Sequence, residues 1–334
     1  MNLQQLRIVR ETARRQFNLT EVAHALCTSQ SGVSKHLIDL EDELGVQLFV
    51  RHGKRLLGLT EPGRELLPMV ERALLEVGNI RQLADHYART DSGLLRIATT
   101  HTQARYALPR VVARFRADYP QVTLHLHQGS PAEIAALLLA DEADIGVATE
   151  ALADQPDLAC IPFHRWHHAV VVPRGHPLAQ VQPLTLRALA TQPLVTYHPG
   201  FTGRRLVDQA FAAAGLTPNV VLSALDSDVL KAYVELGLGV GVIAPGAFDT
   251  TRDPGLTLLD ASHLFPESTS LVAVRRGRLL RGYATHFIRR CCPQADLTAL
   301  QGHPQSLTRH TAVPPEPLSR PSRQPERLAA SLSR

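Results

Sequence analysis

Apolar residues recur at helical spacing in two short segments near the start of the chain. The first segment follows an i, i+3, i+4, i+7 pattern made by Leu19, Val22, Ala23 and Leu26. Thr20 offers a hydroxyl that could cap this helix. After a turn at residues 27–28, Ser29 is placed as N-cap of a second helix, whose apolar stripe is Val33, Leu37, Leu40 and Leu44. Two short helices joined by so tight a turn predict a helix-turn-helix.

Polar residues fill the opposite face of the second helix, in the turns that a recognition helix presents to base edges. A Gly-centred basic turn without acidic residues follows at residues 51–55 and suits the phosphates beside the groove. We therefore expect DNA contacts from Thr28, Ser29, Gln30, Ser31, Ser34, Lys35, Arg51, Lys54 and Arg55. The alternative is a generic helical pair with a solvated basic turn. The DNA interpretation is favoured because helix pattern, cap, turn and basic hairpin occur in order.

Residues 61–89 change to a single long helical pattern with apolar positions spaced alternately by 4 and 3. These positions are Leu66, Val70, Ala73, Val77, Ile80, Ala84 and Tyr87. Such a seam predicts a partner helix, here from a second copy of the chain. At ~1.5 Å per residue the helix would be roughly 40 Å long. An amphipathic helix that packs within its own chain is the alternative.

The remainder alternates short strands with helices, the α/β pattern in which helices pack on both faces of a sheet. We expect strands at residues 94–98, 122–127, 144–148, 169–172, 220–224, 240–244 and 271–274. Helices are expected at residues 106–118, 131–140, 185–190, 204–214 and 227–236. In open α/β sheets ligands bind at the carboxyl ends of strands, near helix N-termini. This rule points to the hydroxyl-rich segment 99–103, to residues 128–131 and 149–150, and to residues 201–203 before another helix.

Segment 99–103 contains hydroxyls and no lysine, so it suits a small anion held by neutral donors. The alternative is that its threonines merely cap helices. Competing motifs fail on context. Gly237, Gly239 and Gly241 follow a helix and enter a strand, the reverse of a dinucleotide loop. His125 and His127 share a strand face without an acidic or cysteine partner, and His167 and His168 point apart, so we expect no metal site. No catalytic constellation is evident, and we expect neither a cofactor nor an enzyme.

Length and composition agree with a DNA-binding protein of more than one domain. The chain has 334 residues, too many for one ordinary core, and 44% of them are hydrophobic. No apolar run approaches a membrane span and no signal-peptide core is present, so we expect a cytoplasmic protein. The four cysteines form no C-x-x-C pair, which suits a reduced compartment. The net charge is only +4, so DNA affinity must come from local patches. The proline-rich segment after about residue 295 is expected to be disordered.

Several of these motifs together resemble the LysR-type transcriptional regulators. The resemblance rests on residues 3–7, 28–35, 40–45 and 59–63, with Phe49, Arg51 and Gly53. Within that family the chain is more similar to the CysB-like regulators of sulfur metabolism, on residues 97–109, 127–131, 148–151, 200–203 and 237–244. The resemblance covers about residues 1–292. His198 and Pro199 depart from the pattern and leave the ligand preference of the second wall open.

The resemblance implies a winged helix-turn-helix, a linker helix and a periplasmic-binding-protein-like effector domain of two α/β subdomains. Applied to this chain, it places the DNA-binding domain at residues 1–60, the linker at 61–92 and the effector domain at 93–295. Subdomain I would comprise residues 93–163 plus 266–295, subdomain II residues 164–265, and the disordered tail residues 296–334. By motif it also implies that the effector cleft is lined by Thr100, Thr102, Gln103, Thr149 and Thr202.

The function so implied is control of sulfur assimilation, cysteine biosynthesis or sulfonate use. The implied effector is N-acetylserine or O-acetylserine, or a sulfur oxyanion such as sulfate or thiosulfate. The implied partners are double-stranded promoter DNA, RNA polymerase and further copies of the chain, for which we expect a tetramer although a dimer stays open. The alternative function is a cytosolic small-anion-binding or enzymatic α/β protein with an incidental helical N-terminus.

Overall fold

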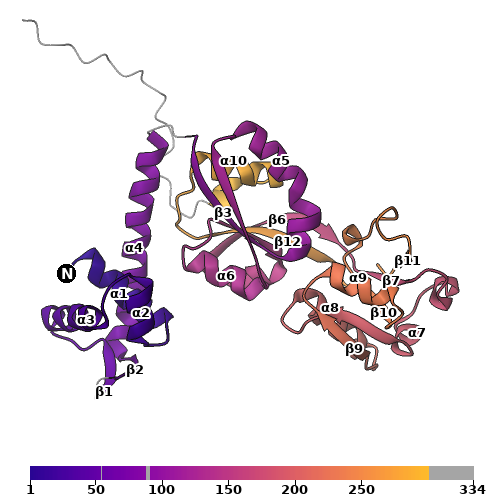
Figure 1. The fold of residues 1–334 in the computed structure, drawn as a ribbon, viewed down its shortest axis with the longest axis horizontal. Helices are drawn as coiled ribbons and strands as arrows, with labels where there is room; N and C mark the ends of the chain where they lie inside the picture. Colours follow the sequence, from indigo (N-terminus) through magenta and orange to yellow (C-terminus); the bar gives the residue numbers. More distant parts are fainter. Residues whose placement is uncertain (54, 88–90, 301–334) are drawn as a thin grey trace, which may run out of the picture. The chain divides into compact units, whose positions relative to one another are not determined.

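The computed structural model describes residues 1–53, 55–87 and 91–300. The first part of the chain is a winged helix-turn-helix followed by one long helix (Figure 1). Its elements are α1 (Leu3–Arg14), α2 (Leu19–Ala25), α3 (Gln30–Leu44), β1 (Phe49–His52), β2 (Arg55–Leu59) and α4 (Glu61–Tyr87). Helix α4 begins at Glu61, directly after β2 and Thr60.

The core of this part joins helices that are distant in sequence. Ile8 of α1, Val22 of α2 and Leu37 of α3 are completely buried in one cluster with Phe49 of β1. Helix α3 begins at its predicted cap, because the Ser29 hydroxyl accepts a hydrogen bond from the Gly32 amide at 3.1 Å. For α2 the predicted cap was wrong. Asn18 caps that helix by accepting hydrogen bonds from the amides of residues 20 and 21.

The first half of α4 packs on this core. Val70 and Leu74 are buried in the same cluster, so the beginning of the predicted seam is covered within the chain. Met69, directly before Val70, is 60% exposed, and farther along the helix Ile80 and Leu83 are 67% and 37% exposed. A partner helix could therefore contact α4 at these exposed apolar residues. Val70 and Leu74 are already covered by the chain's own core.

Two five-stranded sheets follow, each with helices on its faces. The first sheet has the order β4-β3-β5-β12-β6, with bounds Val122–Gln128, Gly93–Thr99, Ile145–Thr149, Ser268–Arg275 and Leu158–Trp166. The second has the order β11-β7-β10-β8-β9, with bounds Leu256–Leu259, Ala169–Pro173, Val240–Ile243, Pro193–Tyr197 and Asn219–Ala224. Strands β3, β4 and β5 are mutually parallel, as are β8, β9 and β10. The sequence pattern missed β6, β8 and β11.

Helices α5 (Leu108–Asp118) and α10 (Gly282–Cys291) cover one face of the first sheet, and α6 (Pro131–Leu139) covers the other (Figure 1). Around the second sheet lie α7 (Leu186–Ala190), α8 (Thr202–Ala213) and α9 (Ser227–Glu235). The chain returns to the first sheet through β12, as expected. Strand β6 of that sheet continues to Trp166, so the first crossing to the second subdomain lies slightly later than residue 163.

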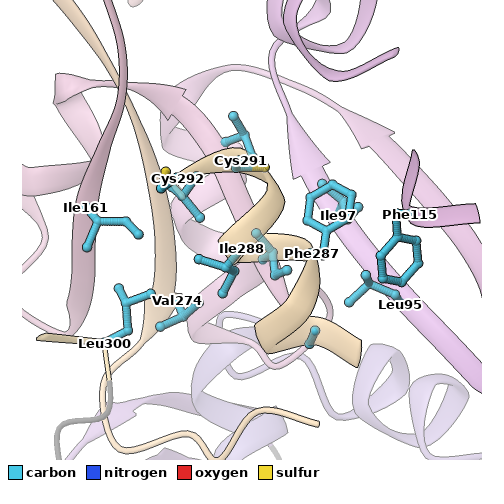
Figure 2. Packing of buried hydrophobic residues seen from close by; sticks show 14 of the residues in the cluster. Leu95, Ile97, Phe115, Ile161, Val274, Phe287, Ile288, Cys291, Cys292 and Leu300 are labelled. Carbon is cyan, nitrogen blue, oxygen red and sulfur yellow. The ribbon is translucent and has the colours of Figure 1, made fainter. Parts of the chain in front are cut away.

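The core under α10 contains residues of this helix and of α5, and it also contains Leu300, which lies in the segment expected to be disordered. Phe115, Phe287 and Ile288 pack there beside Cys291 and Cys292 (Figure 2). Burial raises the pKa of the Cys292 thiol to about 11 and that of Cys291 still further, which agrees with structural roles for both. Leu300 is 1% exposed in the same cluster. Residues 297–299 form a short 3-10 helix, so the expectation of disorder from residue 296 was wrong as far as residue 300. Residues 301–334 lie outside the described part.

Candidate functional site

The predicted DNA-contacting face is presented by the first turns of α3. Gln30, Ser31 and Lys35 are exposed, while Ser34 and Thr28 are partly buried. The hydroxyls of Ser29 and Ser31 lie 3.2 Å apart. Helix α3 ends at Gly45, whose φ of +69° is the left-handed conformation that glycine adopts without strain. In a helix-turn-helix, the N-terminal residues of the second helix contact base edges in the major groove, and α3 presents its polar residues there.

The wing is tied to this helix by a buried carboxylate. Glu41 of α3 is 7% exposed, and its Oε1 accepts hydrogen bonds from the amides of Leu48 and Phe49 at 2.8 and 3.1 Å. Its Oε2 accepts from Arg51 at 2.6 Å. Arg51 thus helps to anchor the wing, a role that the sequence did not suggest. Arg55 is exposed, and Lys54 lies outside the described residues.

Every side chain expected at the effector site lines one cavity between the two sheets. They are Thr100, Thr102, Gln103, Thr149 and Thr202. Thr100 follows the carboxyl end of β3, and Thr149 ends β5. Thr202 begins α8, on the opposite wall. The hydroxyls of Thr149 and Thr202 are hydrogen-bonded to each other across the cavity at 2.5 Å. Parallel pairing of β3 with β5 brings Thr100 and Thr149 to one edge of the first sheet, and Thr202 meets them from the second subdomain.

The beginning of α8 adds backbone donors to this cavity. Its N-cap is Phe201, which makes no side-chain capping hydrogen bond. The first amides of a helix carry a partial positive charge and favour an anion in front of them. By contrast, α6 is closed by a capping box of Ser130 and Glu133, so the similar segment at residues 128–131 has its amides satisfied. His198 is exposed and contacts the carbonyl oxygen of Pro199, so this departure from the family pattern lies outside the cavity.

Sequence reasoning missed the aromatic part of the second wall. Trp166, His168, Tyr197 and Phe201 all line the cavity. Trp166 is the single tryptophan of the chain, which could have drawn attention to it. For His167 and His168 the sequence analysis weighed only a metal site, which it did not expect. Their placement depends on the end of β6, a strand that the sequence pattern did not reveal.

A second set of contacts joins the subdomains beside the cavity. Asp228 of α9 accepts hydrogen bonds from Tyr106 at 2.6 Å and pairs with Arg105 at 2.8 Å and His101 at 3.1 Å. Burial disfavours the charged form of this carboxyl, but the hydrogen bonds from Tyr106 and His101 outweigh it and lower the pKa of Asp228. Lys231 lies 3.5 Å from the same carboxylate. The charges compensate one another, so these contacts stabilise the approach of the two subdomains seen here.

The same place contains the metal-compatible group found among the described residues, formed by His101, Asp226 and Asp228, with ligand atoms within 4.8 Å of one another. Asp226 is already the N-cap of α9, accepting from the Val229 amide at 2.9 Å. Asp228 is engaged by the cations and hydroxyl described above. This arrangement serves helix capping and ion pairing and gives no reason to place a metal there.

Comparisons with known proteins agree with this architecture. Residues 3–64 match the model of the bacterial regulatory helix-turn-helix of the lysR family, and residues 88–295 match the LysR substrate binding domain. The chain belongs to the LysR family. It is 54% identical over 302 residues to the HTH-type transcriptional regulator SsuR of Burkholderia cenocepacia, covering 90% of this chain and 98% of that protein. It is also 54% identical to the regulator cbl of Escherichia coli over 291 residues, covering 87% and 92%.

A third relative is the regulator CysB of Burkholderia cenocepacia, 52% identical over 283 residues, with coverage of 85% of this chain and 90% of that one. The crystal structure of the cofactor-binding domain of Cbl superposes with a TM-score of 0.60 at 48% identity, covering 62% of this chain and 91% of that domain. The protein is therefore a CysB-like, LysR-type DNA-binding transcriptional regulator. Its relatives are regulators, so the alternative of an enzyme is not supported. No helix in the described residues has the length and apolarity to span a membrane.

Proposed function

We propose that this regulator controls sulfur assimilation genes, including those for cysteine biosynthesis or sulfonate use, in response to a small anion bound between its two sheets. The observation that carries the proposal is the convergence of Thr100, Thr149 and Thr202 on one cavity at the uncapped start of α8. Hydroxyls and helix amides bind anions without a countercharge. Acetylserine, sulfate and thiosulfate are the candidate effectors, and acetylserine is the first to test.

The proposed DNA contacts divide by chemistry. Gln30, Ser31, Ser34 and Lys35, with Thr28 and Ser29 before them, would meet bases or adjacent phosphates. Arg55, and Lys54 beside it, would meet phosphates only. We place the protein in the cytoplasm as a homotetramer that acts with RNA polymerase. The exposed apolar positions of α4 support self-association through that helix.

The test is promoter binding with and without N-acetyl-L-serine, for the wild type, Thr100→Ala and Thr123→Ala. Thr123 is an exposed threonine of the neighbouring strand β4 and serves as the matched control. Removing the Thr100 hydroxyl leaves a ligand oxygen unpaired and should weaken effector binding by roughly 1 to 3 kcal/mol, with promoter affinity unchanged. Thr123→Ala should respond as the wild type does. A wild type whose promoter complex is unchanged by acetylserine, sulfate and thiosulfate would refute the proposal.

A further inference from the structure

Polar atoms without a hydrogen-bond partner gather around the effector cavity. Among the described residues, six buried side-chain polar atoms have none, and three of the six, Gln103 Oε1, Trp166 Nε1 and His168 Nδ1, belong to residues that line this cavity. Gln103 and His168 are only 6% and 3% exposed. A buried polar atom left unpaired is costly, so such atoms are uncommon in folded proteins. Their concentration at one cavity indicates that a ligand supplies the missing partners.

The two walls of the cavity differ in chemistry. The wall from the first sheet carries hydroxyls and an amide, which suit an anionic group. The other wall carries the rings of His168, Tyr197 and Phe201 from the second subdomain, together with the ring of Trp166 at the end of β6. Burial lowers the pKa of His168 to about 4, so this imidazole is neutral at physiological pH. None of these rings offers a positive charge, and the wall is therefore suited to an uncharged part of a ligand.

The imidazole of His168 is held firmly in this wall. The rings of Trp166, Tyr197 and Phe265 surround it, with centroid separations of 6.5, 6.4 and 6.3 Å. Gly203 lies so close that a Cβ there would be 3.1 Å from His168 Nε2 and 2.7 Å from the Tyr197 ring. Only a glycine at this position leaves room for both rings. These neighbours, with Gly203 on the Nε2 side, fix the orientation of the imidazole, so its unpartnered Nδ1 keeps one direction.

We propose that His168 is a specificity-determining residue, whose Nδ1 hydrogen-bonds the uncharged acyl amide or ester of an organic ligand while the threonines hold its anionic group. This inference rests on the proposed function and narrows its ligand class. An acylated organic anion fills both walls, whereas an inorganic oxyanion engages only the hydroxyl wall. His168 thereby selects for the acyl group and contributes little to binding of sulfate.

The test is calorimetry on the full-length protein with two probes, N-acetyl-L-serine and sulfate. His168→Phe keeps a ring of similar size and removes the hydrogen bond, while His168→Asn keeps a hydrogen-bonding group near the position of Nδ1. The matched control is His167→Phe, a change at the neighbouring residue, which does not line the cavity. Circular dichroism establishes that each variant is folded.

We expect His168→Phe to weaken acetylserine binding about tenfold and to change sulfate affinity less than about twofold. His168→Asn should retain acetylserine affinity within about threefold, and His167→Phe should match the wild type. Equal effects of His168→Phe on both probes, no effect on either, or an Asn variant as weak as the Phe variant would overturn the inference. So would a wild type that binds sulfate alone.

Thr100→Ala separates this inference from the proposed function. If it weakens both probes while His168→Phe is not selective, the anion site stands and only the role of His168 is wrong. If the wild type binds neither probe and also fails to bind thiosulfate, the proposed function and this inference fall together.

Discussion

Replacing Glu41 with alanine should release the wing from the recognition helix. The carboxylate accepts two buried backbone hydrogen bonds, from Leu48 at 2.8 Å and Phe49 at 3.1 Å, and one from Arg51. Both amide-bearing residues are completely buried, so water cannot replace the lost acceptor without local opening. Stranding each buried donor costs about 1 to 3 kcal/mol, which makes about 4 kcal/mol for the pair. The ion pair with Arg51 is partly exposed and adds little to this sum.

Hydrogen–deuterium exchange measures the effect locally. A loss of about 4 kcal/mol should speed exchange of the Leu48 and Phe49 amides by up to about 10³-fold, if they exchange through opening of the wing. Promoter and random DNA should both be bound less tightly, because the wing is proposed to contact phosphates. Glu43→Ala changes an exposed glutamate on the same helix and should leave these amides protected. Unchanged protection in Glu41→Ala would refute the view that this carboxylate holds the wing.

Three further outcomes can be measured. Arg55→Ala should weaken binding to promoter and random DNA alike and lower the salt slope of log K by about 1, and an effect on the promoter alone would contradict a phosphate contact. Ile80→Asp should dissociate the oligomer in sedimentation experiments, whereas Arg81→Asp on the same helix should not; an unchanged assembly would mean that α4 does not carry the interface. The buried His168 has its pKa lowered from 6.5 to about 4, so the unfolded chain takes up this proton first as the pH falls. Stability should therefore decline from about pH 6.5 to pH 4, by up to about 3 kcal/mol, and less steeply in His168→Phe; parallel pH profiles of the thermal midpoint would show that the imidazole is not buried as described.

The DNA-reading part was predictable because its signals are local. Helical spacing, the Ser29 cap and the basic turn are each encoded within a few residues, and the structure forms α3 and the wing where they indicated. The threonines of the cavity were predictable for another reason. The rule for open α/β sheets pointed to their segments, which lie at strand ends and helix starts, and the family resemblance selected the individual residues. The convergence of Thr100 with Thr149 follows directly from the parallel pairing of β3 with β5.

The seam of α4 shows where a local pattern is ambiguous. An apolar residue at every third or fourth position indicates that one face of the helix is covered. It does not indicate whether the same chain or a second copy covers that face. Val70 is covered by the protein's own α1 to α3 domain, whereas Ile80 is exposed in this single chain. Only the packing of α4 against its neighbours shows which apolar positions are covered within the chain and which are left exposed.

The sequence by itself determined the family, the recognition helix and the hydroxyl-bearing wall, because these depend on short spacings that survive in any context. Tertiary structure alone decided the rest. Leu300 belongs to a core and not to a tail because the first sheet offers it an apolar surface. Arg51 donates a hydrogen bond to Glu41 because the wing folds back on α3. His168 lines the cavity because an unpredicted strand, β6, ends beside it, and the burial that makes the imidazole neutral is supplied by rings from elsewhere in the chain. Burial and partner identity are properties of contacts between distant segments, and no local pattern encodes them.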